Sequence, residues 1–379
     1  MRFLFTLILN LVFICSTYGQ VKKEILYVGT YSVRGSEGIY VFQIDRAKKI
    51  LKPLQIVPSL ESPTYLAIHP NSKFLYSVNR GKANVEDNGG SVSSYAIDQK
   101  TGRLSGLNHR SSYGDAPCYI SIDKTGAHAF VCNYAGGNLV VLPLFQDGLV
   151  GIPTDAKKYA GKGVNEKRQA EPHIHSATIS ADNKFLYVCD LGTDKIYIYQ
   201  YDAATGKLNV GPIAELNVAP GSGPRHLTFH PNGKYMYLVE EMKSTVCAIE
   251  VDKVTGNLTI LQDTVRALPE TFEGPNSSAD IHINSKGNFL YMSNRGHNSI
   301  SIFAVGLDGT ITLVGQQDTG GKAPRNFIID PKGEFILVAN QDSDSILMYK
   351  TDAKTGKLTV VGKPIKVPSP VCLKILTLP

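Results

Sequence analysis

Residues 223–241 read GPRHLTFHPNGKYMYLVEE, and this stretch carries a complete β-hairpin signal. Apolar residues alternate with polar ones on either side of Pro231-Asn232-Gly233, which is typical of a tight turn between two strands. The ends of the hairpin break this pattern, because one strand begins with Arg225-His226 and the other ends with Glu240-Glu241. The rest of the chain accounts for both features, since the stretch recurs.

Related stretches begin at residues 63, 117, 175, 278 and 324, each with an alternating strand, a turn and a second strand. In most units two further strands follow, joined by D-x-x-T-G-x-L, whose glycine stands where a hairpin turn needs a positive φ. The units recur about every 50 residues, which is the period of a four-stranded β-propeller blade. No helical periodicity is visible, so the sequence predicts an all-β fold.

The seventh unit is split between the two ends of the chain. Strands beginning with ILYVGTY at Ile25 lack a first strand, and PVCLKILTL, residues 370–378, supplies one. We therefore predict a seven-bladed β-propeller with four-stranded antiparallel blades, in which the N- and C-terminal strands share one blade. Such closure removes the free sheet edges that would otherwise pair between molecules.

The first residues predict export. Arg2 precedes an apolar run from Phe3 to Ile14, and small residues up to Gly19 offer a cleavage site, as in a secretory signal peptide. We expect a signal peptide over residues 1–19 and one propeller domain over 20–379, periplasmic or secreted, without a transmembrane segment. The alternatives are a lipoprotein acylated at Cys15 and burial of the run as a first strand.

Composition and charge limit the classes of partner that we expect this protein to bind. The net charge of +6 becomes +5 when residues 1–19, with their one arginine, are removed. No basic stripe or recognition motif accompanies this mild charge, so we expect no nucleic-acid partner. The five cysteines beyond residue 19 lie mostly in apolar runs without a CxxC, which favours buried free thiols over a disulfide. A closed propeller is stable alone, so we expect a monomer.

In a propeller, the start of each first strand and the end of each second strand meet at one mouth of the central channel. First-strand starts bring His175, Arg225 and Arg325 there. Second-strand ends bring Thr30-Tyr31, Asn79-Arg80, Asn133-Tyr134, Asp190-Leu191, Glu240-Glu241, Asn294-Arg295 and Asn340-Gln341. A histidine, several arginines and carboxylates at one mouth indicate a binding site for an anionic, oxygen-rich substrate.

Four segments, residues 29–42, 163–180, 221–241 and 279–300, resemble the seven-bladed-propeller 6-phosphogluconolactonase family, which also contains the fungal carboxymuconate cyclases. The resemblance covers essentially the whole chain after the signal. It implies lactone chemistry, which is either hydrolysis of 6-phosphoglucono-δ-lactone or, as in the cyclases, formation of a lactone. We expect metal-independent hydrolysis of the phosphorylated lactone to 6-phosphogluconate, with no cofactor. A phosphorylated lactone belongs to cytosolic metabolism, so the export signal raises the alternative that an exported member uses another lactone.

The resemblance also implies four catalytic positions, which are His175, Arg225, Glu241 and Arg295. Histidine titrates near neutral pH and suits a general base, while Glu241 could orient it or be the base itself. Arginine donors match an oxyanion, a carboxylate or a phosphate. Their neighbours His173 and Glu240 remain alternatives for the inward-facing residue. As substrate-binding residues we select His173, Arg80, Asn133, Asp190, Glu240 and Arg325.

Other interpretations stay open at this stage. The oxygen ligands of the ring could hold calcium in a metal-dependent lactonase, although the arginines would repel a cation. A non-catalytic, sugar-binding propeller is a second alternative, and a purely structural Arg225–Glu241 ion pair is a third. His69-Pro70 and His230-Pro231 stand at the opposite turns and read as structural. The basic stretch from Lys157 to Arg168 reads as a solvated loop between blades, with a lid as the alternative.

Overall fold

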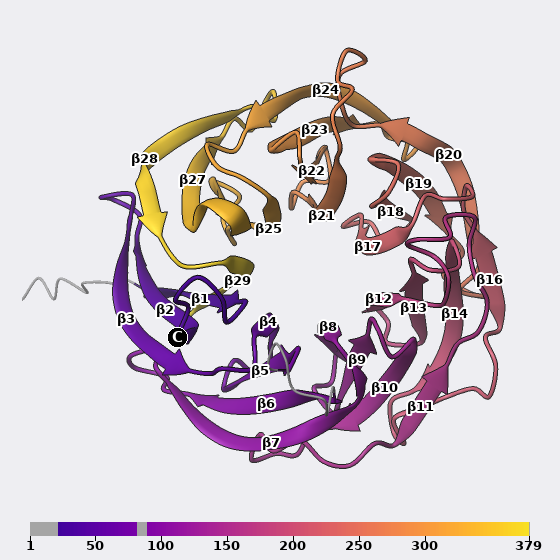
Figure 1. The fold of residues 1–379 in the computed structure, drawn as a ribbon, viewed down its shortest axis with the longest axis horizontal. Helices are drawn as coiled ribbons and strands as arrows, with labels where there is room; N and C mark the ends of the chain where they lie inside the picture. The colour runs from indigo at the N-terminus through magenta and orange to yellow at the C-terminus, as the bar shows by residue number, and fades with distance from the viewer. Residues whose placement is uncertain (1–21, 82–88, 379) are drawn as a thin grey trace, which may run out of the picture.

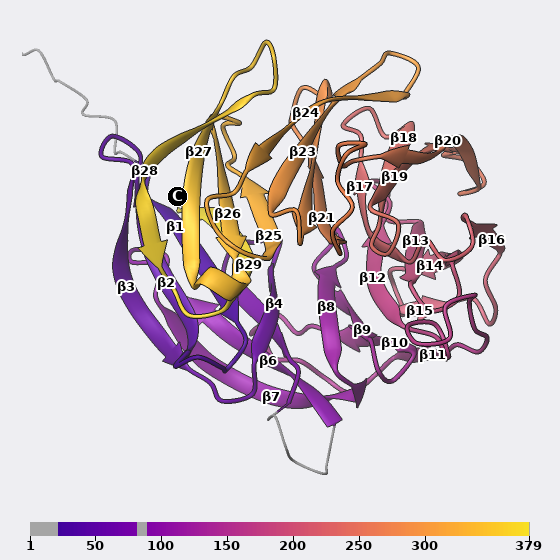
Figure 2. The same ribbon diagram turned by 45° about the horizontal axis from the view of Figure 1, so that its top comes forward.

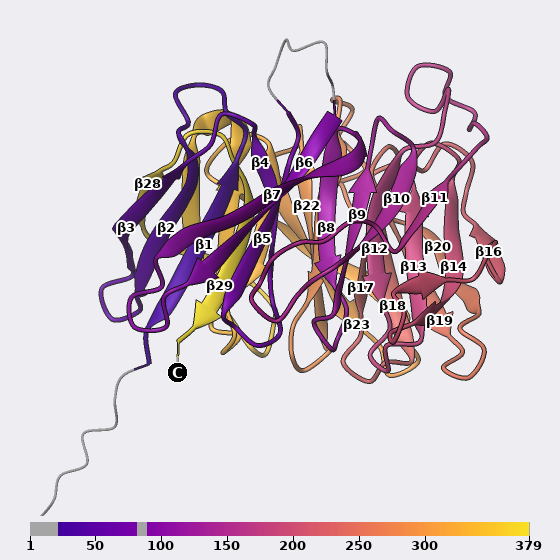
Figure 3. The ribbon, with the colours of Figure 1, turned by 90° about the horizontal axis from the view of Figure 1, so that it is seen from below.

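The computed structural model describes residues 22–81 and 89–378, which form seven antiparallel sheets in a ring around a central channel (Figure 1). The predicted seven-bladed propeller is confirmed. Seen from the side, the ring is a thick disc with the C-terminus at one face (Figure 3). The predicted signal peptide, residues 1–19 with Cys15, lies outside the described residues, so the proposed domain boundary at residue 20 stays a prediction.

The first four blades are given from the channel outward. Blade 1 comprises β29 (Pro370–Thr377), β1 (Glu24–Thr30), β2 (Gly38–Asp45) and β3 (Ile50–Pro58). Blade 2 comprises β4 (Pro63–Ile68), β5 (Phe74–Asn79), β6 (Gly89–Ile97) and β7 (Leu104–Asp115). Blade 3 comprises β8 (Pro117–Ile122), β9 (His128–Asn133), β10 (Asn138–Pro143) and β11 (Asp155–Lys158). Blade 4 comprises β12 (Ile174–Ile179), β13 (Phe185–Asp190), β14 (Lys195–Asp202) and two short strands that both pair with β14, β15 (Lys207–Leu208) and β16 (Ala214–Asn217).

The last three blades follow the same order. Blade 5 comprises β17 (Pro224–Phe229), β18 (Tyr235–Glu240), β19 (Thr245–Val251) and β20 (Leu258–Arg266). Blade 6 comprises β21 (Ser277–Ile283), β22 (Phe289–Arg295), β23 (Ser299–Val305) and β24 (Ile311–Asp318). Blade 7 comprises β25 (Pro324–Ile329), β26 (Phe335–Asn340), β27 (Ser345–Thr351) and β28 (Leu358–Lys366), with the short 3-10 helix η1 (Gln341–Ser343) before β27.

Blade 1 closes the ring with strands from both ends of the chain. β1 lies between β29 and β2, so that Leu26 faces Ile375 on one side and Phe42 on the other. Figures 1 and 2 show the yellow end of the chain returning beside the indigo start. The prediction that the terminal strands share a blade is thus confirmed, and every blade has its channel-lining strand.

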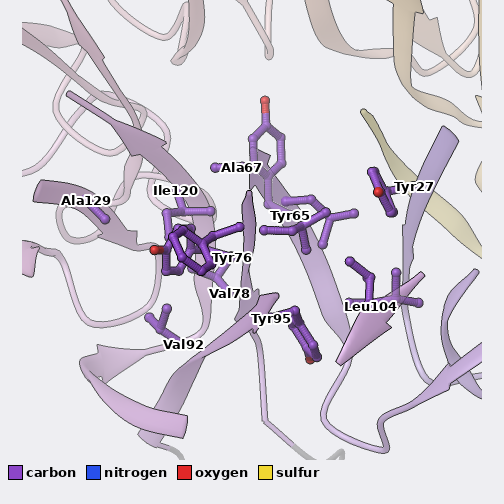
Figure 4. Packing of buried hydrophobic residues seen from close by; sticks show 14 of the residues in the cluster. Tyr27, Tyr65, Ala67, Tyr76, Val78, Val92, Tyr95, Leu104, Ile120 and Ala129 are labelled. Atoms are coloured by element: carbon purple, nitrogen blue, oxygen red, sulfur yellow. The ribbon is translucent and has the colours of Figure 1, made fainter. Parts of the chain in front are cut away.

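The hydrophobic core lies between neighbouring blades. Tyr76 and Val78 of blade 2 belong to one buried cluster with Ile120 and Ala129 of blade 3 (Figure 4). Buried second-strand tyrosines also donate hydrogen bonds to glycine carbonyls in the outer hairpin of the next blade. These pairs are Tyr27 to Gly102 at 2.9 Å, Tyr187 to Gly256 at 3.1 Å, Tyr237 to Gly309 at 3.2 Å and Tyr291 to Gly356 at 3.0 Å.

The glycine of the D-x-x-T-G-x-L turn is needed for the close packing of neighbouring blades as well as for the turn itself. Gly256 has a φ of +78°, and a Cβ there would lie 2.5 Å from the ring of Phe185 in the preceding blade. Both the backbone conformation and the close approach therefore exclude a side chain. The same turn thus closes a hairpin and allows the next blade to pack against it.

A β-bulge interrupts the channel-lining strand of every blade near its mouth end. In blade 5, Pro224 pairs with Glu240 and His226 with Val239, which leaves Arg225 as the extra residue. A bulge takes the extra residue out of the ladder and re-aims its side chain. The residues at this position around the ring are Thr64, Cys118, His175, Arg225, Ala279-Asp280, Arg325 and Val371. The first-strand residues selected from the sequence are all bulge residues.

Further expectations are met outside the mouth. The five described cysteines are buried and unpaired, as expected for free thiols. His69 and His230 use Nε2 to contact the carbonyl oxygens of Gly126 and Gly287 in the next blade, at 2.9 Å and 3.0 Å. Their role in blade packing agrees with the structural role predicted for them. Within residues 22–81 and 89–378, no helix is long and apolar enough to cross a membrane.

Arg46 joins blade 1 to blade 7 on the face opposite the mouth. Its guanidinium binds Glu24 at 2.7 Å, Glu334 at 3.1 Å and the buried carboxylate of Asp330. Arg46→Ala would leave two buried carboxylates without their cation, so we expect a loss of about 3 kcal/mol in the free energy of unfolding. Urea denaturation measures this, with Lys48→Ala, an exposed lysine of the same turn, as the matched control. Equal stability of the two variants would contradict the conclusion that Arg46 stabilises the contact between blades 1 and 7.

Candidate active site

Blade 5 brings two opposite charges to the channel mouth. The bulge re-aims Arg225, and Glu241 follows β18, where its backbone N–H donates to the carbonyl of Gly223 at 2.8 Å. Arg225 Nε then donates to Glu241 Oε2 at 2.9 Å, with both side chains almost fully buried. The charged ends of the hairpin therefore form one ion pair.

The Glu241 carboxylate is shared by three arginines from separate segments. Its Oε2 also contacts Arg295 of blade 6 at 3.1 Å, and its Oε1 accepts a hydrogen bond from Arg168 at 2.7 Å. Burial alone would raise the pKa of Glu241, but Arg295, Arg225 and Arg168 hold it well below its usual range. Glu241 is therefore ionised at neutral pH and serves as the counter-charge of an arginine cluster.

Two of these arginines are fixed by further bonds. Arg225 Nη1 donates to the carbonyl of Ala279, and Arg295 donates to the carbonyl of Ser277 at 3.1 Å and to its hydroxyl at 2.9 Å. Burial lowers the pKa of both arginines, that of Arg295 to about 10, while the neighbouring Glu241 carboxylate raises it and so favours their charged form. Fixed cationic donors in a buried setting suit the stabilisation of a developing negative charge.

His175 lies beside this cluster as an unpaired base. It is buried, and its Nδ1 has no hydrogen-bond partner among the described residues. The edges of Tyr134 and His226 approach it, at ring-centroid distances of 5.6 Å and 5.2 Å. Burial, followed by the charge of Arg225, holds the pKa of His175 well below its usual range. Its imidazole is therefore neutral and can accept a proton.

Aromatic rings fill the channel directly beneath the mouth. Tyr65 of blade 2, Tyr119 of blade 3 and His226 of blade 5 meet there, with ring centroids 4.5 Å to 5.9 Å apart. Asp280 of blade 6 accepts a hydrogen bond from His226 Nδ1 at 2.8 Å and contacts His282 Nε2 at 3.0 Å. Burial lowers the pKa of His226 to about 3, so its ring is neutral. This layer forms a floor below the arginines.

Two more arginines lie at the mouth against aromatic rings. Arg325 stands 5.4 Å from the ring centre of Tyr31, and Arg80 stands 5.8 Å from that of Tyr134. Burial raises the pKa of Tyr31, but Arg325, Arg80 and Arg295 together lower it below its ordinary value. The positive charges of arginines from three blades therefore act on Tyr31 at the mouth.

Other residues selected from the sequence point to neighbouring strand ends. Asn133 donates to the carbonyl of Ser112, Asp190 accepts from the backbone N–H groups of His173 and Gly192, and Glu240 accepts from the Thr245 hydroxyl. These bonds favour structural roles for Asn133, Asp190 and Glu240, and substrate binding by them stays a prediction. His173 stacks on Tyr134, with ring centroids 4.3 Å apart, beside the mouth.

The sequence predicts only a solvated loop or a lid at Arg168, and it predicts no role for Asp280. Arg168 is 42% exposed, as expected for a solvated loop, but its guanidinium also binds the buried Glu241. Its only sequence signal is that it lies within the segment 163–180 that carries the family resemblance. Asp280 occupies the register position that His226 holds in blade 5, so alignment of the repeats could have found it.

The oxygen ligands considered for calcium are engaged elsewhere. Asn79 and Asn294 each donate their amide to serine hydroxyls of their own blades, and Glu241 is held by arginines. In the part of the chain that the structure describes, no three His, Cys, Asp or Glu side chains form a group that could hold a metal ion.

The neutral state of His226 makes the fold sensitive to mild acid. The pKa of His226 is near 3 in the fold and about 6.5 in an unfolded chain, so only the unfolded chain takes up this proton between those values. Its stabilising contribution is full above about pH 6.5 and declines as the pH falls. We expect the free energy of unfolding to drop by about 2 kcal/mol between pH 7 and pH 5 from this residue. His226→Gln should show a correspondingly smaller decline in urea denaturation, and an unchanged decline would contradict the assignment.

Known proteins resemble this chain over nearly its whole described length. The family model "Lactonase, 7-bladed beta-propeller" matches residues 25–375. A 6-phosphogluconolactonase of Bacillus subtilis is 37% identical over 94% of this chain and 99% of its own, and one of Formosa agariphila is 34% identical over 93% and 99%. The solved structure of a periplasmic gluconolactonase of Pseudomonas aeruginosa, 32% identical, superposes with a TM-score of 0.87 over 94% of this chain and 100% of that one. The chain belongs to the seven-bladed β-propeller lactonase family.

Proposed function

We propose that this protein hydrolyses 6-phosphoglucono-δ-lactone to 6-phosphogluconate. The observation that carries the proposal is the buried His175, neutral and unpartnered at Nδ1 among the described residues, beside arginines fixed on Glu241. A base and preorganised cationic donors are the two requirements for hydrolysing an ester bond in a ring. The name of the Bacillus subtilis relative supports the choice of lactone.

In the proposed reaction, His175 takes a proton from a water molecule as the oxygen of that water attacks the lactone carbonyl carbon. The carbonyl oxygen becomes an oxyanion, which Arg225 and Arg295 stabilise. The bond from the carbonyl carbon to the ring oxygen then breaks, and protonated His175 returns its proton to the leaving alkoxide. His175 is regenerated neutral, and the carboxylic acid that is formed releases its proton to solvent to give the carboxylate of the product.

Glu241 acts in this scheme through the arginines. Its Oε2 contacts Arg225 and Arg295 and its Oε1 binds Arg168, whereas Nδ1 of His175 has no hydrogen-bond partner among the described residues. The part of Glu241 is to orient the arginine donors and to offset their mutual repulsion. We therefore assign Glu241 as a positioning residue and His175 as the base.

An anionic substrate fits the electrostatics of the mouth. Burial is the largest cause of the lowered pKa of His175, and the charges of Arg225, Arg325 and Arg295 lower it further, because a protonated imidazole would add another positive charge there. A bound phosphate would offset those charges and move the pKa of His175 upward, towards that of an effective base. Arg80 and Arg325 are proposed to attract the phosphorylated substrate from the rim.

Unphosphorylated glucono-δ-lactone is the second candidate substrate. The predicted export signal favours it, and so does the structural similarity to the periplasmic gluconolactonase. We extend the export prediction as a proposal, with a periplasmic or secreted protein that acts as a monomer.

The test is turnover of both lactones by the purified protein and by His175→Gln. We expect chelator-resistant hydrolysis, with kcat lowered by ~10² to 10⁴ in His175→Gln, as for loss of a general base. His109→Gln, at an exposed histidine of β7, is the control and should keep full activity. Wild-type kcat in His175→Gln would refute the assignment of the base, and turnover of neither lactone would refute the proposed function.

A further inference from the structure

The link between blades 3 and 4, residues 159–173, is the longest of the seven connections between blades, and we call it the strap. The other links span residues 59–62, 116, 218–223, 267–276, 319–323 and 367–369. All seven run to the mouth end of the next channel-lining strand, so the strap lies over the same face as the arginine cluster. In this position a long connection can add side chains that the blades do not supply.

The strap is held in a defined conformation. Gln169, fully buried, donates from Nε2 to the Leu191 carbonyl and to Asp194, each at 2.8 Å, which attaches the strap to blade 4. Its Oε1 accepts the backbone N–H of Asn165 at 3.1 Å, and its backbone N–H donates to the Asn165 carbonyl at 2.7 Å. Arg168, the residue next to Gln169, therefore extends from a fixed turn.

Close packing against blade 4 supports the same view. A Cβ added at Gly192 would lie 2.0 Å from the carbonyl oxygen of Glu171, and one added at Gly163 would lie 2.5 Å from the Gln169 side chain. A contact below 3.0 Å with a backbone atom requires the chain to shift, so Gly192 of blade 4 must be glycine for the strap to lie where it does. The strap is thus packed on blade 4 at Glu171, and Gly163 lets it fold closely around the side chain of Gln169.

Arg168 is the outermost of the three arginines on Glu241. Its side chain is 42% exposed, against 3% for Arg225 and 17% for Arg295. It binds the oxygen Oε1, while the two blade arginines use Oε2. A ligand entering the mouth from solvent therefore meets Arg168 before the two deeper arginines.

We propose that Arg168 contacts the substrate and binds its phosphate group, so that the strap selects phosphorylated over unphosphorylated lactone. This rests on the proposed lactonase function. Nη2 of Arg168 is engaged with Glu241, and a guanidinium has five N–H donors, so it can hold Glu241 and an oxyanion together.

The charge balance of the cluster supports an anionic partner. Three arginines against one carboxylate leave a formal charge of three minus one, or +2. A phosphate monoester carries about −1.5 to −2 at neutral pH, which matches that excess. Neutralising Glu241 itself requires only one arginine, so the other two exceed what the buried carboxylate needs.

Arg168→Ala, Arg168→Lys and the wild type are compared on 6-phosphoglucono-δ-lactone and glucono-δ-lactone, with thermal unfolding as the check on folding. We expect Arg168→Ala to lower kcat/KM on the phosphorylated lactone ~10- to 100-fold, mainly through KM, as for loss of a charged hydrogen bond. On the unphosphorylated lactone the change should stay below ~3-fold. Arg168→Lys should recover part of the loss because it keeps the charge.

Lys167→Ala is the matched control, since it removes one positive charge from an exposed neighbour on the same strap. It should match the wild type on both lactones. Equal losses on both lactones in Arg168→Ala would mean that Arg168 acts only through Glu241, and would overturn the proposal. No loss on either lactone would overturn it as well.

Calorimetric binding of 6-phosphogluconate and gluconate separates this proposal from the proposed function. If the wild type hydrolyses neither lactone, the lactonase proposal fails, and the strap proposal still predicts weaker binding of 6-phosphogluconate by Arg168→Ala with gluconate binding unchanged. Unaltered binding of 6-phosphogluconate would then overturn the strap proposal too.

Discussion

A single buried carboxylate, Glu241, holds together the site on which the proposed chemistry depends. Its two oxygens bind arginines from blade 5, blade 6 and the strap before blade 4, with N–O distances of 2.7 Å to 3.1 Å. A buried carboxylate without these partners would be strongly destabilising, and so would three guanidinium groups packed together without it. The interaction therefore fixes the directions of the donors while keeping them charged.

The propeller supplies the geometry that this carboxylate needs. Ring closure by β1 and β29 fixes the distances between blades, so residues far apart in sequence meet at one mouth. The bulge in each channel-lining strand then decides which side chain is re-aimed, and it selects His175, Arg225 and Arg325. The filled layer of Tyr65, Tyr119 and His226 keeps these groups on one side of the channel. The bulges are therefore the feature of the fold that brings the proposed catalytic side chains into the mouth.

Most of the fold could be predicted from the sequence because the repeat is regular. The hairpin at residues 223–241 and its relatives predict the blades, and the unpaired strand at residues 370–378 predicts the closure. The site was harder to predict than the fold. Side chains alternate along a strand, and the sequence does not say which of two neighbouring residues faces inward. At Glu240-Glu241 the contacts decide, since Glu240 bonds Thr245 and Glu241 bonds the arginines. Arg168 could not be predicted, because its position depends on the folding of the strap around Gln169.

The pH dependence of kcat/KM for Glu241→Gln on 6-phosphoglucono-δ-lactone tests the central claim most directly. If Glu241 positions arginines and His175 is the base, the variant should lose activity over the whole pH range and keep an acidic limb. That limb should move to lower pH, because the unopposed arginines would depress the pKa of His175 further. An unchanged rate would contradict the role of the cluster. Disappearance of the acidic limb would make Glu241 the base and contradict the assignment of His175.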